Sequence, residues 1–135
     1  MSNFVIFDSS VLIDQIRTNR HLDRIMHLDG IVRSSSVVLA ELWRGVSSPV
    51  DRKVVEALER SHPILTPTEK NWLESGGILA KIRDDNGYQP EKLRDLHFDM
   101  LIALTARSHG ARLITSNRAD FELIRGYRDF KLEVW

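Results

Sequence analysis

The chain has 135 residues, which is the size of one ordinary domain and is enough to bury a core without disulfides. Lysine plus arginine equals aspartate plus glutamate, 19 of each, so the formal net charge is zero and any contact with nucleic acid must come from a local basic patch. The absence of cysteine excludes disulfides, a thiolate nucleophile and cysteine-ligated zinc. We expect a single domain over 1–135 in a soluble, cytoplasmic protein, because the sequence shows no signal-peptide pattern and no apolar run of membrane-spanning length.

The first stretch, Phe4 to Phe7, consists of four consecutive apolar residues and is typical of a central parallel strand buried on both faces. Asp8 follows at its carboxyl end, where ligands bind in open α/β sheets. Two interpretations stay open here. Asp8 is a ligand or catalytic group, or it only caps a helix that begins at Ser9 or Ser10 and is expected to end at Asn19.

The middle of the chain alternates short strands with helices. Strands are expected at Ile31–Val32 and, briefly, within Pro63–Pro67, the second near a sheet edge because prolines bound it. The helix predicted over 37–46 follows three serines that can cap it, and it is apolar nearly all round, which predicts burial. Glu41 lies among these apolar residues. A further helix is expected to begin at Pro49.

The last half has the strongest helical pattern. A helix is predicted from Thr68 to Arg83, with Gly76–Gly77 as a soft point or break, and another from Leu93 to His109. Two further strands are expected at Arg112–Thr115 and Lys131–Val134. Strands alternating with helices predict right-handed βαβ units, and therefore an α/β fold: a three-layer α/β/α sandwich around a central, mostly parallel sheet of four to five strands.

Three carboxylates, those of Asp8, Glu41 and Asp99, lie in segments whose pattern predicts burial. Because an unpaired buried charge costs several kcal/mol, each of them needs an arginine partner or a metal ion. Three separate salt bridges are one explanation. We favour convergence, since each acid is predicted near the carboxyl end of a strand or in the first turns of the following helix. Carboxylates without cysteine or clustered histidine indicate a hard cation, Mg²⁺ or Mn²⁺.

Three more polar residues are candidates for the same site. Asp95 lies one helical turn before Asp99 and is either an additional ligand or a favourable charge in the first turn of a helix. Asn117 and Asp120 follow the Arg112–Thr115 strand and resemble a capping box, a role that does not exclude one in the site.

Four segments, taken in this order and at this spacing, resemble the PIN-domain ribonucleases, and within them the VapC-like toxins of toxin–antitoxin pairs. The resemblance covers nearly the whole chain, and it rests on Phe4–Leu12 (F-V-I-F-D-S-S-V-L), Ser36–Leu42, Asp99–Ala106 and Thr115–Phe121.

The resemblance implies a metal-dependent endoribonuclease with Asp8, Glu41 and Asp99 around Mg²⁺ or Mn²⁺. It places Asn117 near the fourth catalytic position, with Asp120 close by as the alternative and otherwise as a supporting residue. It also implies supporting roles for Ser10 and Thr115, a homodimer, and a small antitoxin protein that blocks the acidic pocket. The neutral amide of Asn117 leaves one metal or two open.

An acidic pocket repels RNA, so basic side chains around it are needed to hold the phosphate backbone. The candidates are Arg17, Arg20, Arg44, Arg83, Arg94 and Arg118. Two other functions are considered: a catalytically degenerate PIN-like module that binds RNA or protein, and a receiver-like domain phosphorylated on its strand-end aspartate.

Overall fold

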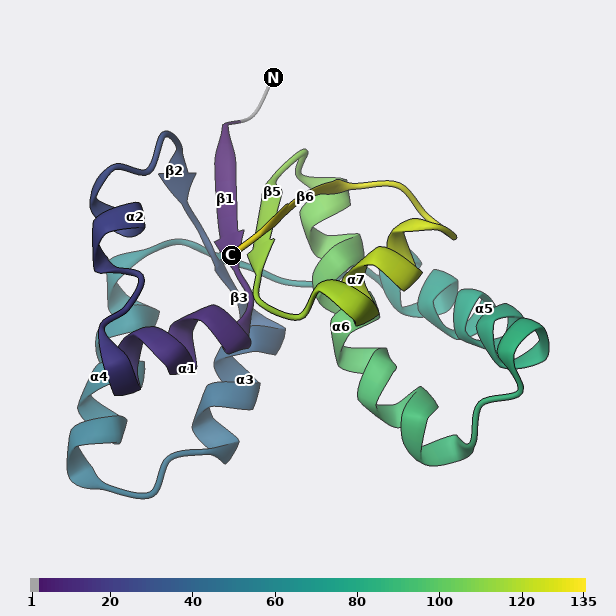
Figure 1. Ribbon diagram of the computed structural model, residues 1–135, viewed down its shortest axis with the longest axis horizontal. Helices are drawn as coiled ribbons and strands as arrows, with labels where there is room; N and C mark the ends of the chain where they lie inside the picture. Colours follow the sequence, from purple (N-terminus) through teal and green to yellow (C-terminus); the bar gives the residue numbers. More distant parts are fainter. Residues whose placement is uncertain (1–2) are drawn as a thin grey trace.

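One main parallel sheet organises the structure, a computed structural model that describes residues 3–135. Its four strands are β1 (Phe4–Phe7), β2 (Ile31–Val32), β5 (Arg112–Thr115) and β6 (Lys131–Val134), in the order β2-β1-β5-β6 (Figure 1). A separate two-stranded parallel pair joins β3 (Ser34–Ser35) to β4 (Ile64–Leu65). The 64–65 strand is therefore confirmed, but it pairs outside the main sheet.

The strands are connected by helices whose bounds agree closely with the sequence pattern. They are α1 (Ser9–Thr18), α2 (Leu22–Met26), α3 (Ser36–Arg44), α4 (Pro49–Ser61), α5 (Glu69–Asn86), α6 (Pro90–Ser108) and α7 (Arg118–Arg125). Within the described range, none of these helices combines the length and the apolar character needed to cross a membrane.

Helices cover both faces of the sheet and give the predicted three layers. Val5 and Phe7 point to one face and Ile6 to the other, because successive side chains of a strand alternate. Val5 and Phe7 pack with Val11 of α1 and with residues of α2, whereas Ile6 belongs to the larger core built with α3, α5, α6 and α7. The predicted α/β/α architecture is confirmed.

The order of the strands creates a binding position at one edge of the sheet. From β1 the chain moves to β2 on one side, and it later returns to β5 on the other side of β1. Right-handed crossovers put the connecting helices of these two excursions on opposite faces. The crevice at the carboxyl ends of β1 and β5, where the direction of winding reverses, is where ligands bind in such sheets. Asp8 lies there, and its N–H donates to the Ile114 carbonyl at 2.9 Å.

Two details of the helices differ from the sequence prediction. Helix α5 continues through Gly76 and Gly77, because tertiary packing of its buried face, which includes Leu79 and Ile82, overrides the low helix propensity of glycine. Helix α6 begins at Pro90, so Asp99 lies in the middle of a helix and not in its first turns.

Candidate active site

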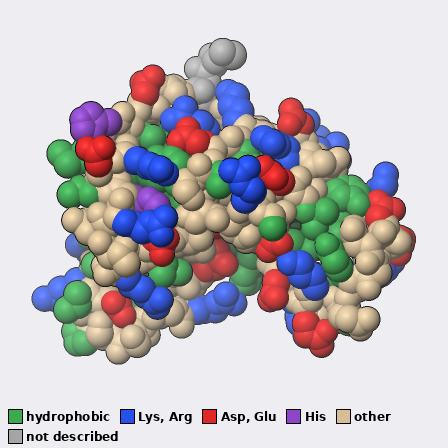
Figure 2. All heavy atoms as spheres, viewed as in Figure 1, with side chains coloured by type: hydrophobic (Ala, Val, Ile, Leu, Met, Phe, Trp, Pro, Cys, Tyr) green, Lys and Arg blue, Asp and Glu red, His purple; other side chains and the backbone are tan. Residues whose placement is uncertain are grey.

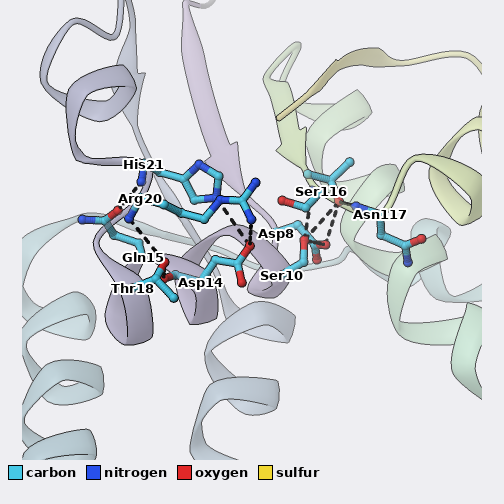
Figure 3. A network of polar contacts seen from close by, with 10 residues as sticks. Asp8, Ser10, Asp14, Gln15, Thr18, Arg20, His21, Ser116 and Asn117 are labelled. Atoms are coloured by element: carbon cyan, nitrogen blue, oxygen red, sulfur yellow. Dashed lines mark hydrogen bonds and ion pairs between the residues drawn. The ribbon is translucent and has the colours of Figure 1, made fainter.

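Asp8 is the most buried acid of the site, with 3 % of its surface exposed. Its Oδ2 accepts hydrogen bonds from Ser10 Oγ and from Thr115 Oγ1, both at 2.8 Å (Figure 3). Asp8 stands at the N-cap position of α1, but its side chain makes no capping hydrogen bond, so the interpretation of Asp8 as a simple helix cap is wrong. Among the described residues nothing donates to Asp8 Oδ1, although that oxygen is buried.

Backbone groups fix the two hydroxyls that hold Asp8. Ser10 Oγ accepts from the Ser116 N–H at 3.1 Å, and Thr115 Oγ1 accepts from the Asn117 N–H at 2.9 Å. Each hydroxyl therefore receives a hydrogen bond from the loop after β5 and gives its own proton to Asp8. The family resemblance implies supporting roles for Ser10 and Thr115, and the structure brings both hydroxyls against Asp8.

Glu41 of α3 and Asp99 of α6 approach Asp8 from two other elements. Burial raises the pKa of Glu41, and the charge of Asp8 raises it further, against the hydrogen bond from Ser9 and the charge of Arg44. Burial also raises the pKa of Asp99, to about 8, and the charges of Asp8, Glu41 and Asp120 add to this effect while Lys92 opposes it. The three acids therefore share one electrostatic environment.

The explanation by three separate salt bridges is wrong. None of the ion pairs formed by the described residues involves Asp8, Glu41 or Asp99. The direct partners of the acids are neutral hydroxyls instead, including Ser9 Oγ, which donates to Glu41 Oε1 at 3.2 Å. From the sequence, Ser9 is predicted only as a helix start, because a sequence does not show which way a side chain points.

The acids open into a cleft of about 820 Å³, and Figure 2 shows the hollow at the lower edge of the molecule with charged side chains around it. Helices α1, α3, α6 and α7 form its walls. The lining residues include all the sequence-predicted acids together with Asn117: Asp8, Glu41, Asp95, Asp99, Asn117 and Asp120. Asp95 is exposed, in contrast to Asp8 and the half-buried Glu41 and Asp99.

Asn117 and Asp120 form the expected cap of α7 and also belong to the cleft. Asn117 Oδ1 accepts from the Asp120 N–H at 3.4 Å, and Asn117 Nδ2 donates to Asp120 Oδ2 at 3.2 Å. Lys92 Nζ donates to the other oxygen, Asp120 Oδ1, at 2.7 Å. The sequence analysis missed Lys92. Its signal is the spacing of seven residues from Asp99, which puts both on one helix face.

The predicted RNA-binding arginines divide into three groups. Arg44 and Arg94 line the cleft, and the Arg44 guanidinium lies over the Phe98 ring at 4.9 Å from its centre. Arg17 lies in a small adjoining pocket with Glu41. Three more do not line the cleft and pair elsewhere: Arg20 with Asp14, Arg83 with Asp84, and Arg118 with Glu122.

The donor chemistry of the site fits a hard divalent cation. The free oxygen of Asp8 is buried at the cleft, and carboxylates are the ligands that Mg²⁺ and Mn²⁺ prefer. As the side chains lie, no three Asp, Glu, His or Cys residues in the described part of the chain surround a common point closely enough to hold a metal ion.

Comparisons with solved structures show chains of the same fold. A chain of VapBC2 from Rickettsia felis bound to a DNA fragment from the promoter has a TM-score of 0.73 and 20% identity, and the match covers 98% of each chain. DNA-bound VapBC from Salmonella typhimurium gives a TM-score of 0.72 at 23% identity over 100% of this chain and 99% of that one. VapBC-5 from Mycobacterium tuberculosis gives a TM-score of 0.61 at 22% identity, and the match covers 98% of this chain and 97% of that one.

A search of the curated proteins found no match. The family model of the PIN domain matches residues 5–126, which is most of the chain and includes every acid of the cleft. This agrees with the resemblance carried by the four sequence segments and with the parallel sheet, and it excludes the receiver-like alternative. The chain belongs to the PIN domain family.

Proposed function

We propose that the protein is a Mg²⁺- or Mn²⁺-dependent endoribonuclease that hydrolyses RNA phosphodiester bonds and acts as the toxin of a toxin–antitoxin pair in the cytoplasm. The observation that carries the proposal is the buried Oδ1 of Asp8, which has no donor among the described residues and lies beside two further acids in an open cleft. A cation explains why a folded protein tolerates this oxygen and the mutual repulsion of the acids.

Asp8, Glu41 and Asp99 are the residues that would hold the cation. When bound, it would neutralise charge on the phosphoryl oxygens and lower the pKa of an attacking water. Ser10 and Thr115 keep Asp8 Oδ2 occupied, so that Oδ1 is the oxygen left for binding. Arg44 and Arg94 at the cleft wall can hold the phosphates on either side of the cleaved bond.

Cleavage of RNA by the purified protein tests this proposal. We expect products with Mg²⁺ or Mn²⁺, none with EDTA, and none from Asp8→Asn. Asp23→Asn is the matched control, because Asp23 is a fully exposed acid on α2 whose ion-pair partner is His27. If wild-type protein with either metal leaves RNA intact, and Asp8→Asn is as toxic on expression as wild type, the proposal is wrong.

The second candidate is a catalytically degenerate module that binds RNA or protein without cutting. The observation that favours it is that the carboxylates are not already arranged at metal-ligand distances. Metal titration separates the two candidates. A nuclease site raises the melting temperature as Mn²⁺ is added, in proportion to the logarithm of its concentration above Kd, and a degenerate site does not.

We also propose a small antitoxin protein as partner. Solved chains of the same fold come from VapBC structures, and a further one comes from a toxin-antitoxin complex from Klebsiella pneumoniae. An apolar groove of about 380 Å³ between α1, α2 and α4 supports the proposal as a surface against which such a partner would pack, and it is lined in part by Leu12, Ile16, Leu22, Ile25, Val54 and Leu58. Leu22→Glu should abolish copurification with an antitoxin encoded beside the toxin, whereas Val50→Glu, an exposed apolar position outside the lining, should not.

A homodimer is the remaining part of the proposal. Helix α5 presents Trp72 and Leu73 to solvent at 50% and 72% exposure. Two copies meeting there would bury this apolar surface. Light scattering should give twice the mass of 15.6 kDa for wild type and a monomer for Leu73→Glu.

A further inference from the structure

Lys92 lies where the electrostatics of its own helix do not favour a lysine. It belongs to the first turn of α6, and the N-terminal end of a helix carries partial positive charge. The ion pair of Lys92 with Asp120 of α7 supplies the compensation, at 2.7 Å between Nζ and Oδ1. This pair is partly sheltered, since the side chains of Lys92 and Asp120 are 37% and 20% exposed.

The contacts of Asp120 leave neither of its carboxylate oxygens free. Lys92 holds Oδ1, and the Asn117 amide holds Oδ2 at 3.2 Å. Asp8 is the opposite case, because its Oδ1 has no donor among the described residues. An oxygen that already accepts a charged hydrogen bond is a poor ligand until that bond is broken. Asp120 therefore lines the cleft as an acid that is already neutralised.

The balance of charge in the cleft points the same way. Asp99 and Asp120 line the same cleft, so a free Asp120 carboxylate would be available to a second cation there. The ammonium of Lys92, 2.7 Å from Asp120 Oδ1, supplies a fixed positive charge on this side of the cleft. Its hydrogen bond with Asp120 raises the pKa of Lys92, which keeps the ammonium charged at neutral pH.

We propose that Lys92 is a positioning residue that, together with Asn117, holds Asp120 out of the ligand set, so that the site takes one divalent cation instead of two. The inference rests on the cation-binding part of the proposed function. Asp8, Glu41 and Asp99 would then bind this single cation, and the ammonium of Lys92 would take the place of a second cation.

Counting bound Mn²⁺ by electron paramagnetic resonance, with affinities from calorimetry, tests the proposal without relying on activity. Wild type and Lys92→Arg should bind one Mn²⁺ per chain. Lys92→Gln frees Oδ1 of Asp120 and removes one positive charge, so this variant should bind two Mn²⁺, with the first about tenfold tighter. The control is Lys70→Gln, which removes an exposed lysine of α5 whose partner is Glu74, and it should still bind one.

The double variant Lys92→Gln/Asp120→Asn distinguishes positioning from a structural tether between α6 and α7. Positioning predicts a return to one Mn²⁺, because the released acid is gone. A tether predicts that Lys92→Gln only lowers the melting temperature and leaves the stoichiometry at one, which overturns the proposal. If circular dichroism shows that Lys92→Gln does not fold, the test uses wild type and Lys92→Arg. Two Mn²⁺ per chain in either protein overturns the proposal, and one Mn²⁺ per chain in both supports it.

The outcome also separates this inference from the nuclease proposal. If wild type binds one Mn²⁺ and Lys92→Gln binds two, but no RNA is cleaved, the role of Lys92 is supported and the proposal of nuclease activity is wrong. If wild type cleaves RNA and binds two Mn²⁺, nuclease activity is supported and the proposed role of Lys92 is wrong. If wild-type protein binds no Mn²⁺, both proposals are wrong.

Discussion

Thr115, at the end of β5, donates a hydrogen bond of 2.8 Å to the carboxylate of Asp8, which lies 107 positions earlier in the chain at the end of β1. The two residues meet because β1 and β5 are parallel neighbours whose carboxyl ends reach the same edge of the sheet. This contact orients the acid on which the proposed metal site depends.

Thr115→Val keeps the shape of a fully buried side chain but removes the donor to Asp8 Oδ2. We expect a loss of about 1–3 kcal/mol in the free energy of unfolding, measured by urea denaturation, and at least a tenfold loss of Mn²⁺ affinity, roughly 1.4 kcal/mol. Thr105→Val is the matched control, because Thr105 is equally buried and donates only within α6. Equal Mn²⁺ affinities in the two variants would contradict the prediction.

Stability of the metal-free protein should depend on pH through Asp99. Its pKa is about 8 in the folded protein and 3.8 as the ordinary value, so the folded state binds more protons than the unfolded state between these limits. The free energy of unfolding therefore falls as pH rises through this range. Melting temperatures measured in EDTA from pH 5 to 9 should decline less steeply for Asp99→Asn than for wild type. Parallel curves would show that Asp99 is an ordinary acid.

Binding of RNA should depend on Arg94, which lines the cleft, and not on Arg83, which pairs with Asp84 outside it. In an Asp8→Asn background that prevents cleavage, Arg94→Gln should weaken binding and reduce the slope of log K against log salt by about one, as expected for the loss of one phosphate contact. Arg83→Gln should leave both the affinity and the slope unchanged. Filter binding at several salt concentrations measures both.

Substitution by alanine should change the stability of the protein in opposite directions at two of its glycines, Gly76 and Gly30. A Cβ at Gly76, within α5, meets nothing within 4 Å, so Gly76→Ala should raise the free energy of unfolding by about 0.5–1 kcal/mol. Gly30 has φ +149° and its Cβ would lie 2.6 Å from Val5 Cγ2, so Gly30→Ala should destabilise the protein. Thermal unfolding of both variants measures the difference.

The sequence by itself determined the fold class and the three central acids. Consecutive apolar residues at 4–7 and 112–115 identify strands buried on both faces, and such strands need helices on each side. Asp8, Glu41 and Asp99 were recognisable because a carboxylate within an apolar pattern requires compensation, wherever its partner lies. Ser10 and Thr115 came from the family resemblance, and the structure places both against Asp8.

Only the tertiary structure decided which groups pair with which. The sequence does not show that Lys92 reaches Asp120 or that Ser9 reaches Glu41, because these contacts join different elements whose relative placement depends on packing of the whole core. For the same reason, Arg44 and Arg94 lie at the cleft while Arg20, Arg83 and Arg118 do not line it. Local pattern identifies which side chains need a partner, and long-range packing selects the partner.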